Sequence, residues 1–184
     1  MLLFPDAAVV ADAAAERRAH NVETLWRPAY VAIGSNLESP RERVLEALER
    51  LKQVRATSSL LRSRLYLSRP MGPQNQPDYI NAAAGLLTQL APAELLEELI
   101  GIERSMGRER RERWGARVID LDLVWMVDSP VASPGLTLPH PGVSMRNFVL
   151  YPLADIVPTL NIPGHGNVLE LLARAGDNGI SVLQ

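Results

Sequence analysis

Two aspartates, Asp120 and Asp122, alternate with apolar residues in the stretch 119–123. Side chains alternate across a strand, so a strand here sets both carboxylates side by side on one face. Two like charges so close repel, and aspartate is depleted in strands. Mg²⁺ suits such a pair because it takes one or two carboxylates together with phosphate oxygens. The pair predicts a metal site, and a solvated strand face is the alternative.

An arginine-rich segment, residues 107–117, directly precedes the two aspartates. Five of its residues are arginines: Arg108, Arg110, Arg111, Arg113 and Arg117. Guanidinium is permanently charged, and its planar fork fits phosphate oxygens. Trp114 in the same segment is suited to stacking on a flat ring. A solvated basic loop is the alternative, but so dense a cluster beside two carboxylates favours a site for phosphate and metal.

Other polar residues fit the same site less specifically. Glu103 borders the apolar stripe of a predicted helix, where a carboxylate needs a partner: a ligand, Arg104 or an arginine of the loop. Tyr79 and Asn81 share a strand face and suit a flat heterocycle that forms hydrogen bonds, although ordinary strand packing explains them as well. His140 follows a strand-like stretch, from which it could reach a phosphate.

The elements that must position these residues follow from hydrophobic periodicity. Four strands are predicted, at 30–33, 61–67, 79–88 and 118–127. One helix starts at Pro40 behind a capping box of Ser39 and Glu42, and a second runs from Pro92 to Gly107. This β-α-β-β-α-β order predicts an α+β, ferredoxin-like fold, an antiparallel sheet with helices on one face. The proline-rich segment 69–78 is predicted to be a loop. The part after residue 127 is expected to be irregular, apart from a short helix near 168–174.

Length and composition set the broad class. The 184 residues suit one domain, residues 28–184, after an N-terminal extension of residues 1–27. A net charge of −2 argues against binding to nucleic acid or anionic membranes. No apolar run approaches the length of a membrane span, Asp6 and Asp12 interrupt the apolar N-terminal stretch, and cysteine is absent. We therefore expect a cytoplasmic protein, and we separately expect it to be a monomer.

Known phosphate-binding motifs help to narrow the function. The chain has no G-x-x-x-x-G-K-[ST] motif and is therefore not a P-loop enzyme. It instead resembles the family of 6-hydroxymethyl-7,8-dihydropterin pyrophosphokinases in four separated stretches that occur in the family's order. These stretches are 32–37 (AIGSNL), 72–81 (GPQNQPDYIN), 113–123 (RWGARVIDLDL) and 138–148, which opens on Leu-Pro-His and closes on Arg-Asn-Phe.

The resemblance implies transfer of pyrophosphate from ATP to the pterin hydroxymethyl group, with release of AMP in folate synthesis. It implies that two Mg²⁺ ions are held by Asp120 and Asp122, and that the transferring phosphates are stabilised by Arg108 and Arg117. It implies contacts to ATP from Glu103, Arg110, Arg113, Trp114, His140 and Arg146. It implies contacts to the pterin from Ser68, Met71, Tyr79, Asn81 and Phe148.

Two alternatives come from other functional classes. A nucleotidyltransferase also combines Gly-Ser with two spaced aspartates, but its Gly-Ser lies close before them, whereas Gly34 and Ser35 lie more than one helix away. Such an enzyme releases pyrophosphate in place of AMP. A non-catalytic ferredoxin-like module that binds RNA or nucleotide is the second alternative. An aromatic content of 5% and the negative net charge argue against a broad RNA-binding surface.

Overall fold

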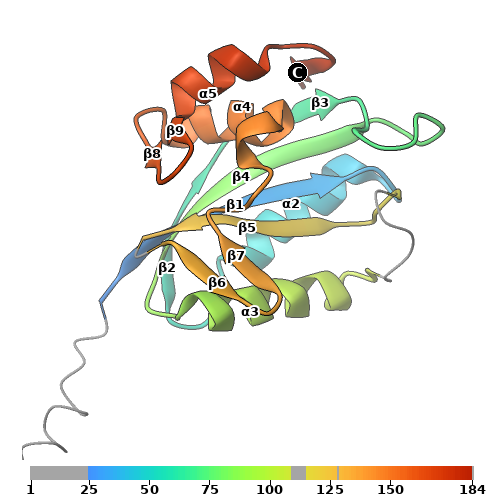
Figure 1. Ribbon diagram of the computed structural model, residues 1–184. Coiled ribbons are helices and arrows are strands. Elements are labelled where there is room, and N and C mark those ends of the chain that lie inside the picture. The colour runs from blue at the N-terminus through green and yellow to red at the C-terminus, as the bar shows by residue number, and fades with distance from the viewer. Residues whose placement is uncertain (1–24, 109–114, 128, 184) are drawn as a thin grey trace, which may run out of the picture.

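The computed structural model describes residues 25–108, 115–127 and 129–183. The strands of its main sheet are β1 (Arg27–Ser35), β2 (Thr57–Arg62), β3 (Tyr66–Ser68), β4 (Tyr79–Thr88), β5 (Asp120–Met126) and β10 (Ile180–Val182). Their order is β10-β3-β4-β1-β5, with β2 also paired to β4, and every pairing is antiparallel (Figure 1). The predicted antiparallel sheet is therefore confirmed.

Helices and two short hairpins complete the described chain. The helices are α2 (Pro40–Leu51), α3 (Pro92–Ser105), α4 (Asn147–Ile156) and α5 (Val168–Ala175), with a 3₁₀ turn at Val143–Met145. The hairpins are β6 (Val131–Ser133) with β7 (Leu136–Leu138), and β8 (Asn161–Ile162) with β9 (Gly166–Asn167). None of the described helices is long and apolar enough to cross a membrane.

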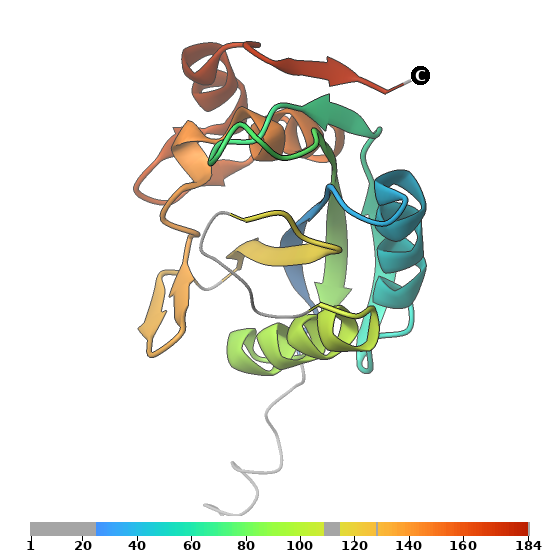
Figure 2. The ribbon, with the colours of Figure 1, turned by 90° about the vertical axis from the view of Figure 1, so that its right-hand side faces the viewer.

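The main hydrophobic core lies between the sheet and the two predicted helices. Val31 and Ile33 of β1 and Leu121 of β5 are buried against Leu48 of α2 and Leu99 of α3. Each fully buried side chain of this size stabilises the fold by about 1.5–3 kcal/mol. The β-strand alternation that buries these residues turns their neighbours to the opposite face of the sheet, which we call the second face. Figure 2 shows α2 and α3 close to the sheet, away from α4 and α5.

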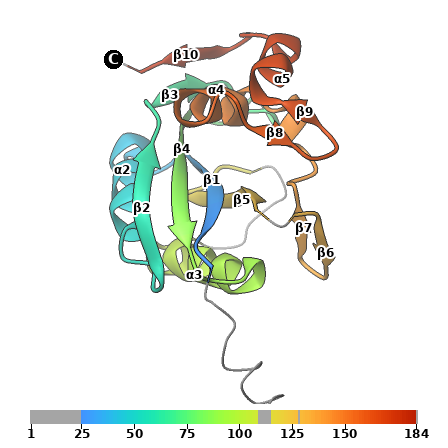
Figure 3. The same ribbon diagram turned by 90° about the vertical axis from the view of Figure 1, so that its left-hand side faces the viewer.

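The second face is covered in part by α4 and α5, so the prediction of helices on one face only is wrong (Figure 3). The region 147–156, predicted to be irregular, is instead a helix. Val149, Leu150 and Leu153 are buried against the sheet, and Pro152 lies within the helix, where it reads from sequence as a breaker. Helix α5 agrees with the short helix predicted near 168–174.

Two local predictions differ from the structure. The single strand predicted at 61–67 is two strands, β2 and β3, which both pair with β4. Ser63 lies between them, and its hydroxyl accepts the Ala83 N–H at 2.9 Å where the ladder is interrupted. The capping box of α2 is also wrong: Ser39 has a left-handed φ of 64° and its side chain makes no capping bond, although α2 does start at Pro40.

The end of α3 brings Arg108 to the sheet. Gly107 has a φ of +88°, which glycine adopts without strain, and the helix ends just before it as predicted. The Arg108 N–H then donates to the Glu103 carbonyl at 3.0 Å. This turn directs the chain from α3 toward the edge strand β5, which carries both aspartates.

Candidate active site

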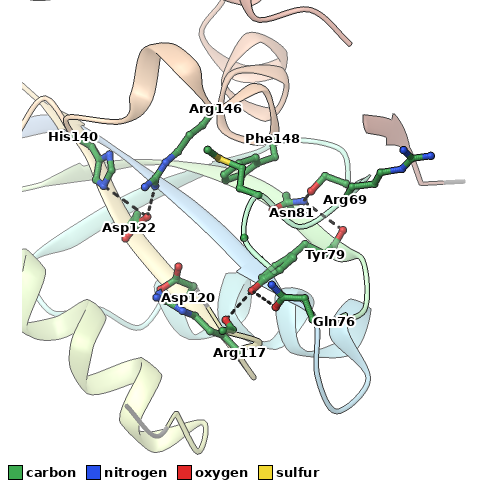
Figure 4. A pocket seen from close by; sticks show the side chains of 14 residues that line it. Arg69, Gln76, Tyr79, Asn81, Arg117, Asp120, Asp122, His140, Arg146 and Phe148 are labelled. Atoms are coloured by element: carbon green, nitrogen blue, oxygen red, sulfur yellow. Dashed lines mark hydrogen bonds and ion pairs between the residues drawn. The ribbon is translucent and has the colours of Figure 1, made fainter. Parts of the chain in front are cut away.

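The two aspartates lie on the second face of the sheet, as the alternation predicts. Ile119, Leu121 and Leu123 are buried in the main core, whereas Asp120 and Asp122 line a pocket of about 320 Å³ (Figure 4). The loop 69–78, which forms no helix or strand, contributes to the wall of this pocket, and the start of α4 contributes another part. The pocket is therefore bounded by segments that are far apart in sequence.

The small residues of β1 leave room above the sheet. In the sheet register Gly34 lies between Asn81 of β4 and Asp120 of β5, and Ala32 pairs with Asp122. A Cβ atom at Gly34 would lie 3.5 Å from the Asn81 Oδ1 atom. Larger side chains here would fill the space between the aspartates and β4, so the Ala-x-Gly spacing keeps the floor of the pocket open.

Asp120 is held by two arginines. Its Oδ1 atom lies 2.6 Å from Arg117 Nη1 and 2.8 Å from Arg108 Nη1. Arg108 also pairs with Glu103, whose carboxylate accepts the Leu121 N–H at 2.6 Å. Arg117 lines the pocket, whereas Arg108 reaches Asp120 from outside the lining residues. An anionic ligand in the pocket would compete with Asp120 for these two permanent positive charges.

Asp122 faces a second cationic group. Its Oδ2 atom lies 3.2 Å from Arg146 Nη1 and 4.0 Å from His140 Nε2 (Figure 4). Burial raises the pKa of Asp122, and the Asp120 charge adds to the shift. Burial lowers the pKa of His140, against the pull of Asp122 and together with the Arg146 charge. The Gly142 N–H donates to His140 Nδ1 at 3.1 Å, so a neutral imidazole carries its proton on Nε2, as a donor toward the pocket.

The other wall of the pocket carries aromatic and amide side chains. All five residues predicted to contact the pterin line it: Ser68, Met71, Tyr79, Asn81 and Phe148. The buried Asn81 donates to Ser68 Oγ at 2.9 Å, which fixes its amide. The Arg146 guanidinium lies 6.0 Å from the centre of the Phe148 ring. This wall can stack on a flat ring and form hydrogen bonds with its edge.

Glu103 does not line the pocket. It is 5% exposed and is engaged by the Leu121 N–H and Arg108, so the alternative of a partner in the arginine loop describes what the structure shows. Its contact to ATP remains a prediction. Arg110, Arg113 and Trp114, which were also predicted to contact ATP, lie outside the described residues, as does Arg111.

Comparison with known proteins decides the family. The family model described as 7,8-dihydro-6-hydroxymethylpterin-pyrophosphokinase (HPPK) matches residues 30–158. The chain belongs to the HPPK family. It is 44% identical over 154 residues to the 2-amino-4-hydroxy-6-hydroxymethyldihydropteridine pyrophosphokinase of Pseudomonas aeruginosa, covering 84% of this chain and 95% of that relative. The enzyme of that name from Haemophilus influenzae is 41% identical over 150 residues, covering 82% and 94%.

A solved structure supports the HPPK fold. The crystal structure of Plasmodium falciparum HPPK-DHPS with pteroate has a TM-score of 0.65 and 13% sequence identity. The match covers 84% of this chain and 44% of that longer chain. Together with the family match, this confirms the resemblance read from the four sequence stretches, and with it the class of ATP-dependent diphosphokinase.

Several residues of the HPPK pocket were missed by sequence reasoning as site residues. Gln76 and Gly115 line the pocket, Gly34 lies at its floor, and Asn36 binds two of its surrounding segments. All four lie inside stretches that carry the family resemblance, so the sequence marked their positions. It did not mark their roles, because an amide or glycine far away in sequence gives no signal of which loop it meets.

The carboxylate pair fits the metal ions that the resemblance implies. Among the described residues no group of three or more acidic or histidine side chains forms a cation cage. Asp120 and Asp122 instead offer two carboxylates beside open pocket space, which matches the way Mg²⁺ binds together with phosphate oxygens. Burial and the neighbouring Asp120 charge both raise the pKa of Asp122, and a bound cation would oppose that shift.

Glu103 should make the stability of the protein depend on pH. Burial raises the pKa of Glu103 to about 7, although the Leu121 N–H and Arg108 oppose the shift. The folded state then holds this proton more tightly than the unfolded state, so stability is lost as pH rises through the folded pKa. The free energy of unfolding of the wild type should therefore fall by about 3 kcal/mol between about pH 4.5 and pH 7.5. Glu103→Gln, which keeps the acceptor for the Leu121 N–H, should not show this fall. Urea unfolding followed by tryptophan fluorescence measures it, and superimposable pH profiles of the two proteins would contradict it.

Proposed function

We propose that this pocket transfers the pyrophosphoryl group of ATP to 6-hydroxymethyl-7,8-dihydropterin, giving the pterin diphosphate and AMP in folate synthesis. The observation that carries the proposal is the division of one pocket into two halves. Asp120, Asp122, Arg117 and Arg146 form a charged half, and Tyr79 with its neighbours forms a half suited to a flat heterocycle. ATP and the pterin are the two partners that such a pocket would bring together.

The charged half would bind the phosphates of ATP. Phosphoryl transfer depends mainly on positioning and on stabilisation of charge. Arg117 and Arg108 would turn from Asp120 to phosphate oxygens, and His140 would donate its Nε2–H to another. Arg146, from the opposite side, would hold a phosphate oxygen near Asp122. Glu103 would act by orienting Arg108, while Arg110, Arg113 and Trp114 would contact ATP from the loop between α3 and β5.

We further propose that Asp120 and Asp122 hold two Mg²⁺ ions, which when bound neutralise phosphate charge and leave the β-phosphorus open to attack. The reaction forms a bond between the pterin hydroxymethyl oxygen and the β-phosphorus. It breaks the bond between that phosphorus and the oxygen bridging to the α-phosphorus, so AMP leaves. The hydroxyl proton is released as the new bond forms.

The aromatic half would hold the pterin. Tyr79 and Phe148 would pack on its ring, and Asn81, fixed by Ser68, would meet its hydrogen-bonding edge. Met71 is 55% exposed on the loop 69–78, where it would cover the bound ring. The exclusion of water by such a cover would protect the reacting centre from hydrolysis.

We also propose a topology, a domain and an oligomeric state for this enzyme. The unit β1-α2-β2-β4-α3-β5 is assigned a ferredoxin-like topology, to which α4, α5, β3 and β10 are additions. Residues 28–184 would form the pyrophosphokinase domain after an extension of residues 1–27. We propose a monomer that acts in the cytoplasm, which sedimentation at several protein concentrations and cell fractionation would test.

Incubation with Mg-ATP and 6-hydroxymethyl-7,8-dihydropterin should release AMP and the pterin diphosphate in equal amounts. The amounts should be equal because one displacement at the β-phosphorus gives both products. Chromatography of the nucleotides and fluorescence of the pterin measure them. A reaction without pterin is the control and should release no AMP. Release of pyrophosphate would favour a nucleotidyltransferase, and nucleotide binding without turnover would favour a non-catalytic module.

A further inference from the structure

Asn36, directly after β1, is a buried amide outside the residues assigned above to ATP, metal or pterin. It is 2% exposed. Its Oδ1 atom accepts the Arg117 N–H at 2.7 Å, and its Nδ2 atom donates to the Pro77 carbonyl at 2.9 Å and to Gln76 Oε1 at 3.2 Å. Both amide protons and the amide oxygen are therefore used, and each points to a segment distant in sequence. The Asn36 N–H also donates to the Arg117 carbonyl at 3.0 Å.

These bonds join the two halves of the pocket. Arg117 belongs to the charged half, where its side chain pairs with Asp120. Gln76 and Pro77 lead within two residues to Tyr79, which belongs to the aromatic half. A second bond links the same two segments, because the Tyr79 hydroxyl donates to the Gly115 carbonyl at 3.1 Å (Figure 4). These part-buried hydrogen bonds give a ligand that orders one segment a path to the other.

We infer that Asn36 is a positioning residue that couples the binding of nucleotide to the binding of pterin. The inference rests on the proposed function. Nucleotide bound by Arg117 orders the segment 115–117. The hydrogen bonds of Asn36 then order residues 76–79 as well, so the pterin binds to a preformed wall of the pocket. Such coupling is reciprocal: each ligand raises the affinity for the other by the same factor. Anchoring the end of β1 alone would produce no such factor.

The replacement Asn36→Asp separates the two sides of the link. Aspartate has the same shape and still accepts the Arg117 N–H, but it places an acceptor against the Gln76 and Pro77 oxygens, which also accept. Contact with 115–117 is kept, and contact with the loop 69–78 is lost. Asn75→Asp is the matched control, since it makes the same chemical change at an exposed position of that loop. Asn36→Ser, which is too short to reach either oxygen and carries no charge, serves if a buried aspartate prevents folding.

Calorimetry measures the coupling factor. Pterin is titrated with and without Mg²⁺ and α,β-methylene-ATP, whose Pα–Pβ link cannot be broken, and the nucleotide is titrated with and without pterin. We expect a factor of about 5–150 for the wild type and for Asn75→Asp. For Asn36→Asp and Asn36→Ser the coupling factor should fall toward 1. The affinity for nucleotide in the absence of pterin should stay within about threefold of the wild-type value, a change smaller than the coupling factor itself.

Three results would overturn the inference. Asn36 variants that keep the wild-type factor show that coupling does not pass through this side chain. A wild-type protein that binds both ligands independently removes the coupling but leaves the proposed function standing. A wild-type protein that binds neither ligand overturns the proposed function as well.

Discussion

Replacing Asp122 by asparagine is expected to lower kcat by about 10³-fold or more while the protein stays folded. Asparagine keeps the shape of the side chain but removes the charge that would hold a divalent cation between phosphate and sheet. Metal ions contribute several kcal/mol of charge stabilisation in such reactions, and each 1.36 kcal/mol corresponds to about tenfold in rate. Release of AMP at saturating Mg-ATP and pterin measures the effect.

The stability of Asp122→Asn distinguishes a functional role from a structural one. The pKa of Asp122 is raised by burial and by the Asp120 charge, so ionised Asp122 is unfavourable in the fold. A neutral isostere removes that unfavourable charge. The midpoint of thermal unfolding should therefore stay the same or rise as activity is lost, which is the pattern of a residue kept for function at the expense of stability.

Two further variants frame this result. Asp120→Asn should also abolish turnover, but it leaves Arg117 and Arg108 without their shared carboxylate, so it should lower stability as well. Glu49→Gln is the matched control, because Glu49 lies exposed on α2 and pairs with Lys52 far from the pocket. The expected loss in kcat is about 10³-fold. The metal assignment would therefore be wrong if both aspartate variants kept kcat within about threefold of wild type.

Sequence periodicity was sufficient for the part of the site that lies on strands. The alternation at 119–123 predicted which face of β5 carries the carboxylates, and the same argument put Tyr79 and Asn81 together on β4. Both predictions are confirmed, because a strand in a half-buried sheet has one choice of face. The helix boundaries at Pro40 and Gly107 were also correct, since proline and glycine restrict the backbone locally.

Long-range partners were not predictable in the same way. Helix α4 was missed because Pro152 reads as a breaker, although its apolar face packs on the sheet. The position of Arg146 opposite Asp122 depends on that helix, so it came from the family resemblance and not from periodicity. Nor does any local pattern indicate that Asn36 contacts both Pro77 and Arg117, because such bonds depend on how three separate segments meet.

Replacing Arg117 by alanine is expected to lower kcat by about 10²–10³-fold, the usual effect of losing one group that stabilises charge in the transition state. Its Nη1 atom lies 2.6 Å from Asp120, inside the pocket, where a phosphate oxygen can take the place of the carboxylate. Arg117→Lys should fall between the two, because lysine keeps the charge but lacks the planar fork. Rates of AMP release across a range of ATP concentrations separate kcat from KM.

The division of the loss between kcat and KM decides the role of Arg117. A contact that strengthens only in the transition state lowers kcat, whereas one made equally to bound ATP raises KM alone. Arg41→Ala is the matched control, since Arg41 is exposed on α2, where it pairs with the neighbouring Glu42 at 3.9 Å. Because the Arg117 N–H is held by Asn36 whatever the side chain, the loop keeps its anchor in Arg117→Ala. A variant with unchanged kcat and a raised KM for ATP would therefore make Arg117 a binding residue and not a catalytic one.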